Sequence, residues 1–102
     1  MKYVLKLFII GETPNSVRAI RNLEKISQLF YKDQCYIKVI DILQNPILIS
    51  EMGIIAVPTL VKSHPPPCRK VIGDLSDIER VIYGLGLKDV IEKIENPHKE
   101  KD

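Results

Sequence analysis

Apolar residues run almost without interruption from position 3 to position 10, and Lys6 is the one charge among them. A strand with one solvated face alternates apolar and polar residues, whereas a strand covered on both faces reads as a nearly continuous apolar run. Residues 3–10 are therefore predicted to form a central strand of an α/β sheet.

The next segment has the period of a helix. Thr13 offers a side-chain oxygen as an N-cap, and Pro14 fits the first helical position, where its missing N–H has no effect. Apolar residues then recur at spacings of three and four, at Val17, Ile20, Leu23, Ile26 and Phe30. This spacing places them in one stripe along a helix of about four turns.

Residues 35–42 form a second apolar run, interrupted by Lys38 and Asp41. A strand, a helix and a strand at this spacing predict a right-handed crossover between parallel strands. The Asn-Pro pair at 45–46 repeats the cap signal and Gly53 supplies a stop, so a short helix is predicted between them. That helix is ambiguous, because its isoleucines would serve equally well in a strand.

A third apolar run, residues 53–62, contains Pro58. Proline cannot donate to a strand ladder, so Pro58 is expected at the first residue of a strand or where the backbone is exposed. Residues 57–61 read as an apolar residue followed by Pro-Thr and then Leu-Val. This order is similar to the cis-proline strand of thioredoxin-like domains, which faces the first helix. The bond before Pro58 is thus a candidate for the cis isomer.

The remaining signals complete the pattern. Three prolines at 65–67 impose an extended turn, and residues 69–72 are predicted as a short strand antiparallel to the third. Ser76 and Glu79 have the spacing of a capping box, which predicts a last helix opening at Asp77. The order βαβαββα is the thioredoxin-like arrangement.

The last helix is loosely specified. Its apolar positions continue to Ile94, but Gly84 and Gly86 interrupt them, and each glycine costs about 1 kcal/mol relative to alanine inside a helix. Residues 1–95 are predicted as one domain, and the charged tail at 96–102 is predicted to be disordered.

Composition limits the classes of function. The chain has 102 residues, 45% of them hydrophobic and 27% charged, with a formal net charge of +2. Scattered cations do not form the basic stripe typical of nucleic-acid binding, and no apolar run is long enough to span a membrane. Residues 1–4 lead directly into a strand and leave no room for a signal peptide, so a cytoplasmic location is expected.

Two hydroxyl residues stand where a thioredoxin-type enzyme carries its thiols. Thr13 and Ser16 fall at the places of the two cysteines of Cys-x-x-Cys, and hydroxyls cannot carry out disulfide exchange. Ser16 would need a base, and the two histidines, His64 and His98, lie in the proline turn and in the tail. The scaffold is therefore predicted without catalytic activity.

The cysteines leave one alternative open. Cys35 and Cys68 have neither metal-ligand nor redox spacing, and His64 with Cys68 is too small a set for a structural zinc site. No metal or cofactor is expected. The alternative function is a thioredoxin-like redox or thiol-sensing protein that uses Cys35 or Cys68.

Several longer motifs point to one family. They are Thr-Pro-Asn-Ser-Val-Arg-Ala at 13–19, Lys-Val-Ile-Asp at 38–41, Asn-Pro at 45–46, Pro-Thr-Leu at 58–60, the three prolines, and Ile-Gly-Asp-Leu-Ser-Asp at 72–77. Over roughly residues 2–87 the chain resembles the KaiB family of clock proteins.

This resemblance implies a non-enzymatic regulator that switches folds. A ground state with the order βαββααβ, usually tetrameric, would exchange with a rare thioredoxin-like monomer that binds the ATPase ring of KaiC. The bound form would capture KaiA, compete with the sensor kinase SasA, and modulate the phosphorylation cycle and output of the ring. Elements after about residue 45 would be rebuilt in the switch, because two packings of one sequence can differ by only a few kcal/mol. A homo-oligomer, dimer or tetramer, is expected for the free chain.

The chain departs from the family pattern at a few positions. Gly-Leu-Gly at 84–86 replaces Gly-Leu-Asp, Gly53 replaces a lysine, and Val57 replaces a threonine. These changes indicate a divergent paralogue of the family, with either a circadian or a stress-related role. The residues expected to bind the partner are Arg18, Lys38, Arg69 and Lys70. Those expected to govern the switch are Pro58, Gly84 and Gly86, and alanine at either glycine is predicted to favour the thioredoxin-like state.

Overall fold

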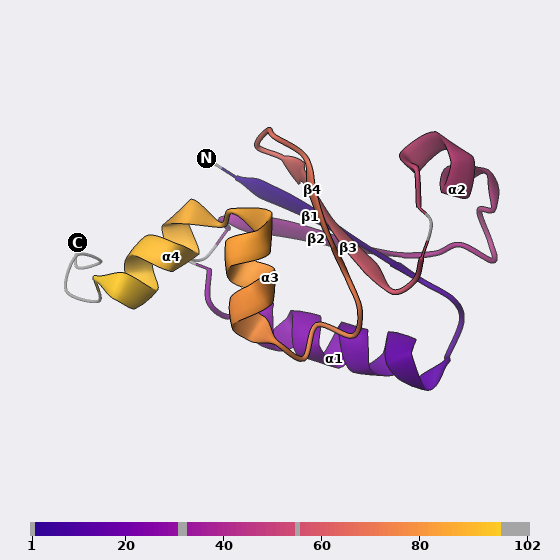
Figure 1. Ribbon diagram of the computed structural model, residues 1–102, viewed down its shortest axis with the longest axis horizontal. Coiled ribbons are helices and arrows are strands. Elements are labelled where there is room, and N and C mark those ends of the chain that lie inside the picture. Colours follow the sequence, from indigo (N-terminus) through magenta and orange to yellow (C-terminus); the bar gives the residue numbers. More distant parts are fainter. Residues whose placement is uncertain (1, 31–32, 55, 97–102) are drawn as a thin grey trace.

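Eight secondary-structure elements make up the fold, which is a computed structural model that describes residues 2–30, 33–54 and 56–96 (Figure 1). In chain order they are β1 (Tyr3–Ile9), α1 (Pro14–Ser27), β2 (Cys35–Asp41), α2 (Ile47–Met52), β3 (Thr59–His64), β4 (Arg69–Ile72), α3 (Ile78–Leu85) and α4 (Lys88–Glu95). The predicted order βαβαββα is confirmed, except that two helices replace the single last one. Most of the predicted tail, residues 97–102, lies outside the described residues.

The four strands form one mixed sheet in the order β2-β1-β3-β4. β1 is parallel to β2, and β3 is antiparallel to both β1 and β4. The predicted central position of β1 and the predicted directions of β2 and β4 are therefore confirmed. α1 and α3 lie on one side of the sheet, and α2 lies on the other side at one end (Figure 1).

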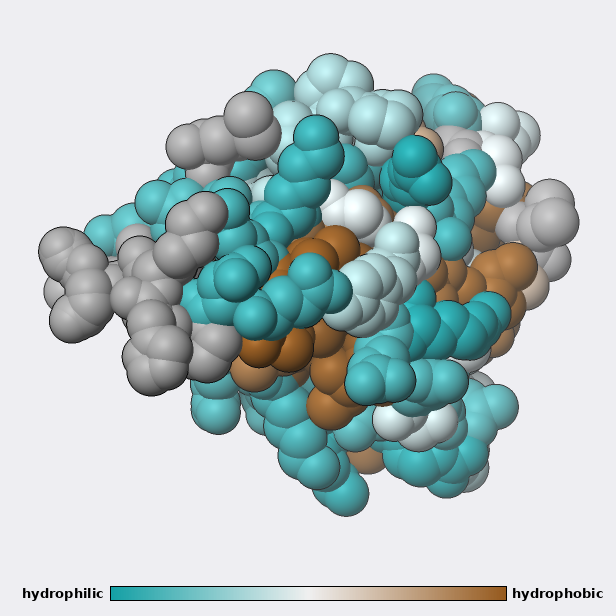
Figure 2. Space-filling model, turned by 60° about the vertical axis from the view of Figure 1, so that its left-hand side comes forward, coloured by the Kyte–Doolittle hydropathy of each residue, from teal (hydrophilic) through white to brown (hydrophobic). Residues whose placement is uncertain are grey.

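Alternate residues of β1 enter two separate clusters of buried side chains. The larger cluster lies on the side of α1 and α3, where Leu5 and Leu7 of β1 pack with Leu23 and Leu85. The smaller cluster lies on the side of α2 and consists of Phe8, Ile42, Ile54 and Val61, with partly buried neighbours. Successive side chains of a strand point to opposite faces of the sheet. Both faces of β1 are therefore covered by buried side chains, as its apolar run predicts. On the face drawn in Figure 2, hydrophobic side chains surface in patches between hydrophilic ones, in the middle of the view and toward its right-hand edge.

The helix starts follow local capping chemistry. Thr13 caps α1 by accepting a hydrogen bond from the Ser16 amide, and Pro14 occupies the first turn, as predicted. The capping box of Ser76 and Glu79 that the sequence predicts for the last helix is wrong, because a different residue caps the helix. Asp77, not Ser76, accepts the hydrogen bond from the Arg80 amide at 3.1 Å, while the Ser76 amide donates to the carboxylate of Asp74.

The end of α3 corrects a second prediction. Gly86 has φ +64° and ends the helix, so the expected continuous helix to Ile94 is wrong. The amide of Leu87 donates to the carbonyl of Ile82, and the amide of Gly86 donates to the carbonyl of Tyr83. These two bonds form a Schellman motif, whose left-handed residue is usually glycine. Gly84 lies inside α3, in a helical conformation.

Pro58 stands directly before β3. The Val57–Pro58 peptide bond is cis, in agreement with the sequence expectation. The carbonyl of Pro58 accepts a hydrogen bond from the Gly73 amide, which follows β4. The residue therefore begins the β3–β4 hairpin without interrupting its ladder.

Candidate partner-binding surface

The hydroxyl pair at the start of α1 forms hydrogen bonds within the local structure. Ser16 is only 1% exposed. The hydroxyl of Thr13 donates to the Ser16 oxygen at 2.8 Å, and the Ile10 amide donates to the same oxygen at 3.2 Å. These bonds tie the helix to the end of β1. The pair thus stabilises the loop at the position where thioredoxins carry a redox centre.

His64 does not support Ser16 as a nucleophile. Ser16 bonds to Ile10, beyond the end of β1, whereas His64 pairs with Val4 near the beginning of that strand. Val4 and Ile10 are six residues apart in extended chain, so the two side chains lie about 20 Å apart along the strand direction. A general base must lie within hydrogen-bond reach of the proton that it removes. His64 is therefore not a base for Ser16.

The two thiols lie at opposite edges of the sheet. Cys35 begins β2 and is partly buried, and Cys68 lies directly before β4 and is exposed. Desolvation raises the pKa of the Cys35 thiol to about 11, although the charge of Lys2 acts in the opposite direction. With two strands between their edges, the thiols cannot form a disulfide with each other.

We expect iodoacetamide to alkylate Cys68 at least tenfold faster than Cys35 at pH 7. A thiol with a pKa of about 11 is ionised to roughly one part in ten thousand at that pH, and the thiolate is the reactive form. Mass spectrometry of the Cys35→Ser and Cys68→Ser variants would measure the two rates separately. The rate at Cys35 should rise as the pH approaches 11. Equal rates at the two sites would show that Cys35 is not in the environment described.

The structure distributes the four predicted partner-binding residues over different surfaces. Lys38 lies in the edge strand β2, while Arg69 and Lys70 lie in the opposite edge strand β4. Three strand spacings separate those edges, roughly 14 Å. Neighbouring residues of a strand face opposite ways, so Arg69 and Lys70 do not share a face either. Arg18 lies on α1.

Arg18 has an intramolecular contact of its own. Its Nε lies 3.2 Å from a carboxylate oxygen of Asp74, in the loop between β4 and α3, and it also bonds to Asn15. Hydrogen bonds from Ser76 first, and from Arg18 next, lower the pKa of Asp74. The Arg18 side chain is still 52% exposed, so it can also meet a partner.

Lys38 and Lys70 belong to one row of residues across the sheet. Lys6 pairs in register with Lys38 on one side and with Val61 on the other, and Val61 pairs with Lys70. Register partners point to the same face, and Val61 belongs to the cluster on the side of α2. The row therefore lies on the face opposite α1. From sequence alone, Lys6 is only an interruption of an apolar strand, although the alternation of Lys6 with Leu5 and Leu7 indicates that it faces the other side of the sheet.

Large side chains border this row. Tyr36 is 52% exposed and Ile72 is 45% exposed, and each lies two residues from a lysine of the row on the same strand. We call Lys6, Tyr36, Lys38, Lys70 and Ile72 the open sheet face. The strand residues of this face include no aspartate or glutamate.

One lysine of the face also has a contact within the chain. Lys70 donates to the carbonyl of Gly53 at 3.4 Å, which links β4 to the end of α2. The face combines positive charge with exposed apolar area, the composition of a docking surface.

Other classes of site find no support in the part of the chain that the structure describes. No three histidine, cysteine, aspartate or glutamate residues of that part are grouped so that they could hold a metal ion. None of its helices is long and apolar enough to cross a membrane.

The topology and the hydroxyl pair define a thioredoxin-like domain without the thiol pair at the start of its first helix. Solved structures agree on the fold. The N-terminal domain of Synechococcus elongatus SasA superimposes with a TM-score of 0.68 at 22% identity, covering 87% of this chain and 88% of that one. Chloroplastic thioredoxin z has a TM-score of 0.66 at 20% identity, covering 84% and 80% of the two chains.

The sequence relatives are closer. The KaiB domain model matches residues 6–87. The circadian clock oscillator protein KaiB of a Picosynechococcus strain is 56% identical over 85 residues, which cover 83% of this chain and 82% of that protein. The KaiB protein of Gloeothece citriformis is 49% identical over 100 residues, covering 98% and 92%. The chain belongs to the KaiB family.

Proposed function

We propose that this chain is a non-enzymatic regulator that binds a KaiC-like ATPase ring in its thioredoxin-like state. The main support for this proposal is the 56% sequence identity to a circadian clock oscillator protein KaiB. The hydrogen-bonded hydroxyl pair at Thr13 and Ser16 supports it, because this position has no thiol chemistry to offer. Binding modulates the phosphorylation cycle of the ring and its output, in a circadian or a stress-related pathway.

The proposed partners include a competitor. The N-terminal domain of SasA has the same fold as this chain, with a TM-score of 0.68. Two domains of one shape can occupy the same surface of a third protein, so we propose that this chain displaces a SasA-type sensor kinase from the ring. The bound chain then captures KaiA.

The proposal includes a second fold. A ground state of the order βαββααβ, assembled as a dimer or tetramer, would rebuild the elements after residue 45. The weak packing of α2 supports this idea, since Ile47 is 64% exposed and Ile49 is 42% exposed. A six-residue helix with such exposure is held by little buried area and can be rearranged at small cost. Pro58, Gly84 and Gly86 lie in the half that would change.

The proposed contact surface is the open sheet face, with Arg18 and Arg69 at separate positions outside it. Its lysines would meet acidic groups of the ring, and Tyr36 and Ile72 would bury apolar area against it. Charges at an interface rim act mainly on the association rate and on specificity. Lys38 lies at the edge of this face and Lys6 in its middle, so we expect charge reversal at either residue to slow association.

Binding of the chain to a KaiC homologue from the same genome tests this function. We expect a complex on size-exclusion chromatography that depends on whether ATP is present. Charge reversal in Lys6→Glu or Lys38→Glu should slow association several-fold, and more so at low salt. Lys25→Glu, which changes an exposed lysine of α1, is the matched control. Absence of a complex with any KaiC homologue, with or without ATP, would contradict the proposal.

A further inference from the structure

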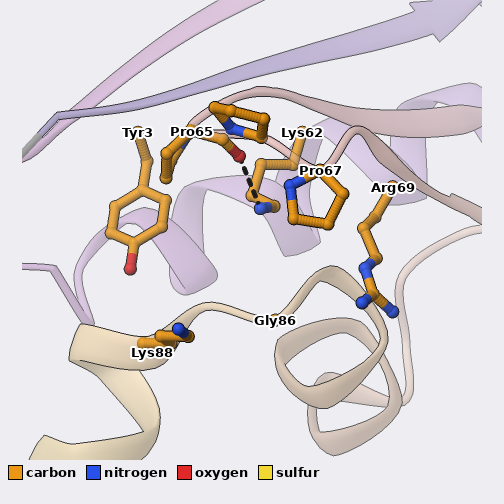
Figure 3. Close-up of a pocket in the computed structure, with 8 residues that line it drawn as sticks. Tyr3, Lys62, Pro65, Pro67, Arg69, Gly86 and Lys88 are labelled. Atoms are coloured by element: carbon orange, nitrogen blue, oxygen red, sulfur yellow. Dashed lines mark hydrogen bonds between the residues drawn. The ribbon is translucent and has the colours of Figure 1, made fainter.

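A small pocket lies between the proline turn and the start of α4. It has a volume of about 170 Å³ and is lined by Tyr3, Lys62, Pro65, Pro66, Pro67, Arg69, Gly86 and Lys88. A single water needs only ~10–15 Å³ measured in this way, so the pocket has room for a larger polyatomic ligand. Figure 3 shows the side chains of Lys62 and Arg69 entering from the hairpin and that of Lys88 from the helix across the space.

Three of the lining residues are cations and none is a carboxylate. Lys62 is the most buried of them, with 3% of its surface exposed. Arg69 is its register partner on β4, and Lys88 is the first residue of α4. Buried cations normally have an anionic partner, because an unpaired charge in a protein interior is unfavourable. Among the described residues, Lys62 has no such partner.

The hydrogen bonds of Lys62 leave donors for a ligand. Its Nζ donates to the carbonyl of Pro65 at 2.8 Å (Figure 3), and this is its one hydrogen bond within the described residues. An ammonium group has three N–H donors, so two remain. Burial lowers the pKa of Lys62, and the charges of Arg69 and Lys88 lower it further, while Cys68 acts in the opposite direction. The surrounding protein therefore does not compensate the positive charge.

Tyr3 adds a neutral donor to the same pocket. Its hydroxyl oxygen accepts a hydrogen bond from the Asp89 amide at 3.2 Å, in the first turn of α4. Tyr3 is 2% exposed, and the Tyr3 hydroxyl proton has no acceptor within the described residues. A hydroxyl can donate while it accepts. The pocket thus combines one hydroxyl donor with two ammonium groups and one guanidinium.

We propose that this pocket binds a small tetrahedral oxyanion, either free phosphate or the terminal phosphoryl group of a nucleotide. Arginine and lysine are the side chains that bind phosphate oxygens most strongly, through charge-assisted hydrogen bonds. The ligand connects β1, the β3–β4 hairpin and the start of α4, which are far apart in sequence. Its binding therefore stabilises this arrangement of the second half of the chain over any fold that separates these elements.

Titration of the isotopically labelled chain with inorganic phosphate tests the site, with sodium chloride used to hold ionic strength constant. The amide signals of Gly86, Lys88 and Asp89 should shift in a saturable way at millimolar phosphate, and the thermal midpoint should rise. Arg69→Gln and Lys88→Gln should each weaken binding at least tenfold. Lys25→Gln, which removes one positive charge from an exposed position of α1 that does not line the pocket, should leave it unchanged.

A parallel titration with ATP distinguishes the two sources of the anion. Tighter binding of ATP than of phosphate at the same amides would identify a nucleotide, and equal or weaker binding would identify the free anion. No saturable shift with either ligand up to tens of millimolar would overturn the proposal. An equal loss of binding in Lys25→Gln and Lys88→Gln would also overturn it, because the effect would then be that of net charge.

Discussion

Replacement of Leu87 by alanine is expected to lower the free energy of unfolding of the thioredoxin-like state by about 2–5 kcal/mol. Leu87 has no exposed surface and lies between α3 and α4, in the same buried cluster as Val90. Truncation would leave a cavity where these two helices meet the sheet. Such a loss is a large part of the ~5–15 kcal/mol that stabilises a typical domain. Urea denaturation of the monomer at low protein concentration would measure it.

The chain offers a matched control for this substitution. Leu43 is 66% exposed in the turn after β2, so Leu43→Ala should change stability by less than ~0.5 kcal/mol. If both variants lost the same stability, Leu87 would not be a core residue and the docking of α4 described here would be wrong.

Gly86→Ala is expected to disfavour the thioredoxin-like state by about 1–2 kcal/mol, which reverses the direction expected from sequence. Gly86 has φ +64°, where a side chain is strained even though no atom lies within 4 Å of an added Cβ. A change of this size reduces the population of the state by about 5–30-fold relative to an alternative. If partner binding requires this state, apparent affinity for a KaiC homologue should fall by the same factor.

Gly84→Ala is the control for Gly86→Ala. Gly84 lies inside α3, where alanine is favoured over glycine by about 1 kcal/mol. An added Cβ would lie 3.2 Å from Cγ2 of Val71, so a small shift of that side chain offsets part of the gain. We expect little net change in binding or in the ratio of monomer to oligomer. Equal effects of the two substitutions would show that the left-handed residue does not decide the equilibrium.

The sequence predicts the parts of the fold that depend on local chemistry. Thr13 and Pro14 identify the start of α1, and the apolar run around Lys6 identifies the central strand. Pro58 identifies the beginning of the hairpin. In each case the residues next to one another in the sequence are sufficient to predict the structural element.

The end of the fold could not be predicted in the same way. Either Gly84 or Gly86 could end α3 on local grounds, and in the structure the helix ends at Gly86 with Leu87 fully buried next to it. Ser76 and Asp77 are both good caps, and the backbone conformation of the loop decides between them. These outcomes depend on tertiary packing.

The candidate surface was predicted in its residue types but not in its arrangement. Lys38 and Lys70 share a row with Lys6 only because of the strand order and register, which no local pattern reveals. Arg69 turns to the other face, into the pocket with Lys62. Long-range pairing thus places Lys38 and Lys70 on one face of the sheet and Arg69 on the other, while Arg18 lies on α1.

We propose that the thioredoxin-like form of this chain is the form that binds a KaiC-like ring. Backbone NMR of the labelled chain bound to its KaiC homologue tests this most directly, because carbon chemical shifts report helix and strand residue by residue. We expect strands at 59–64 and 69–72 and helices at 78–85 and 88–95 in the complex. A bound chain with a strand within residues 78–95, or no complex at all, would contradict it.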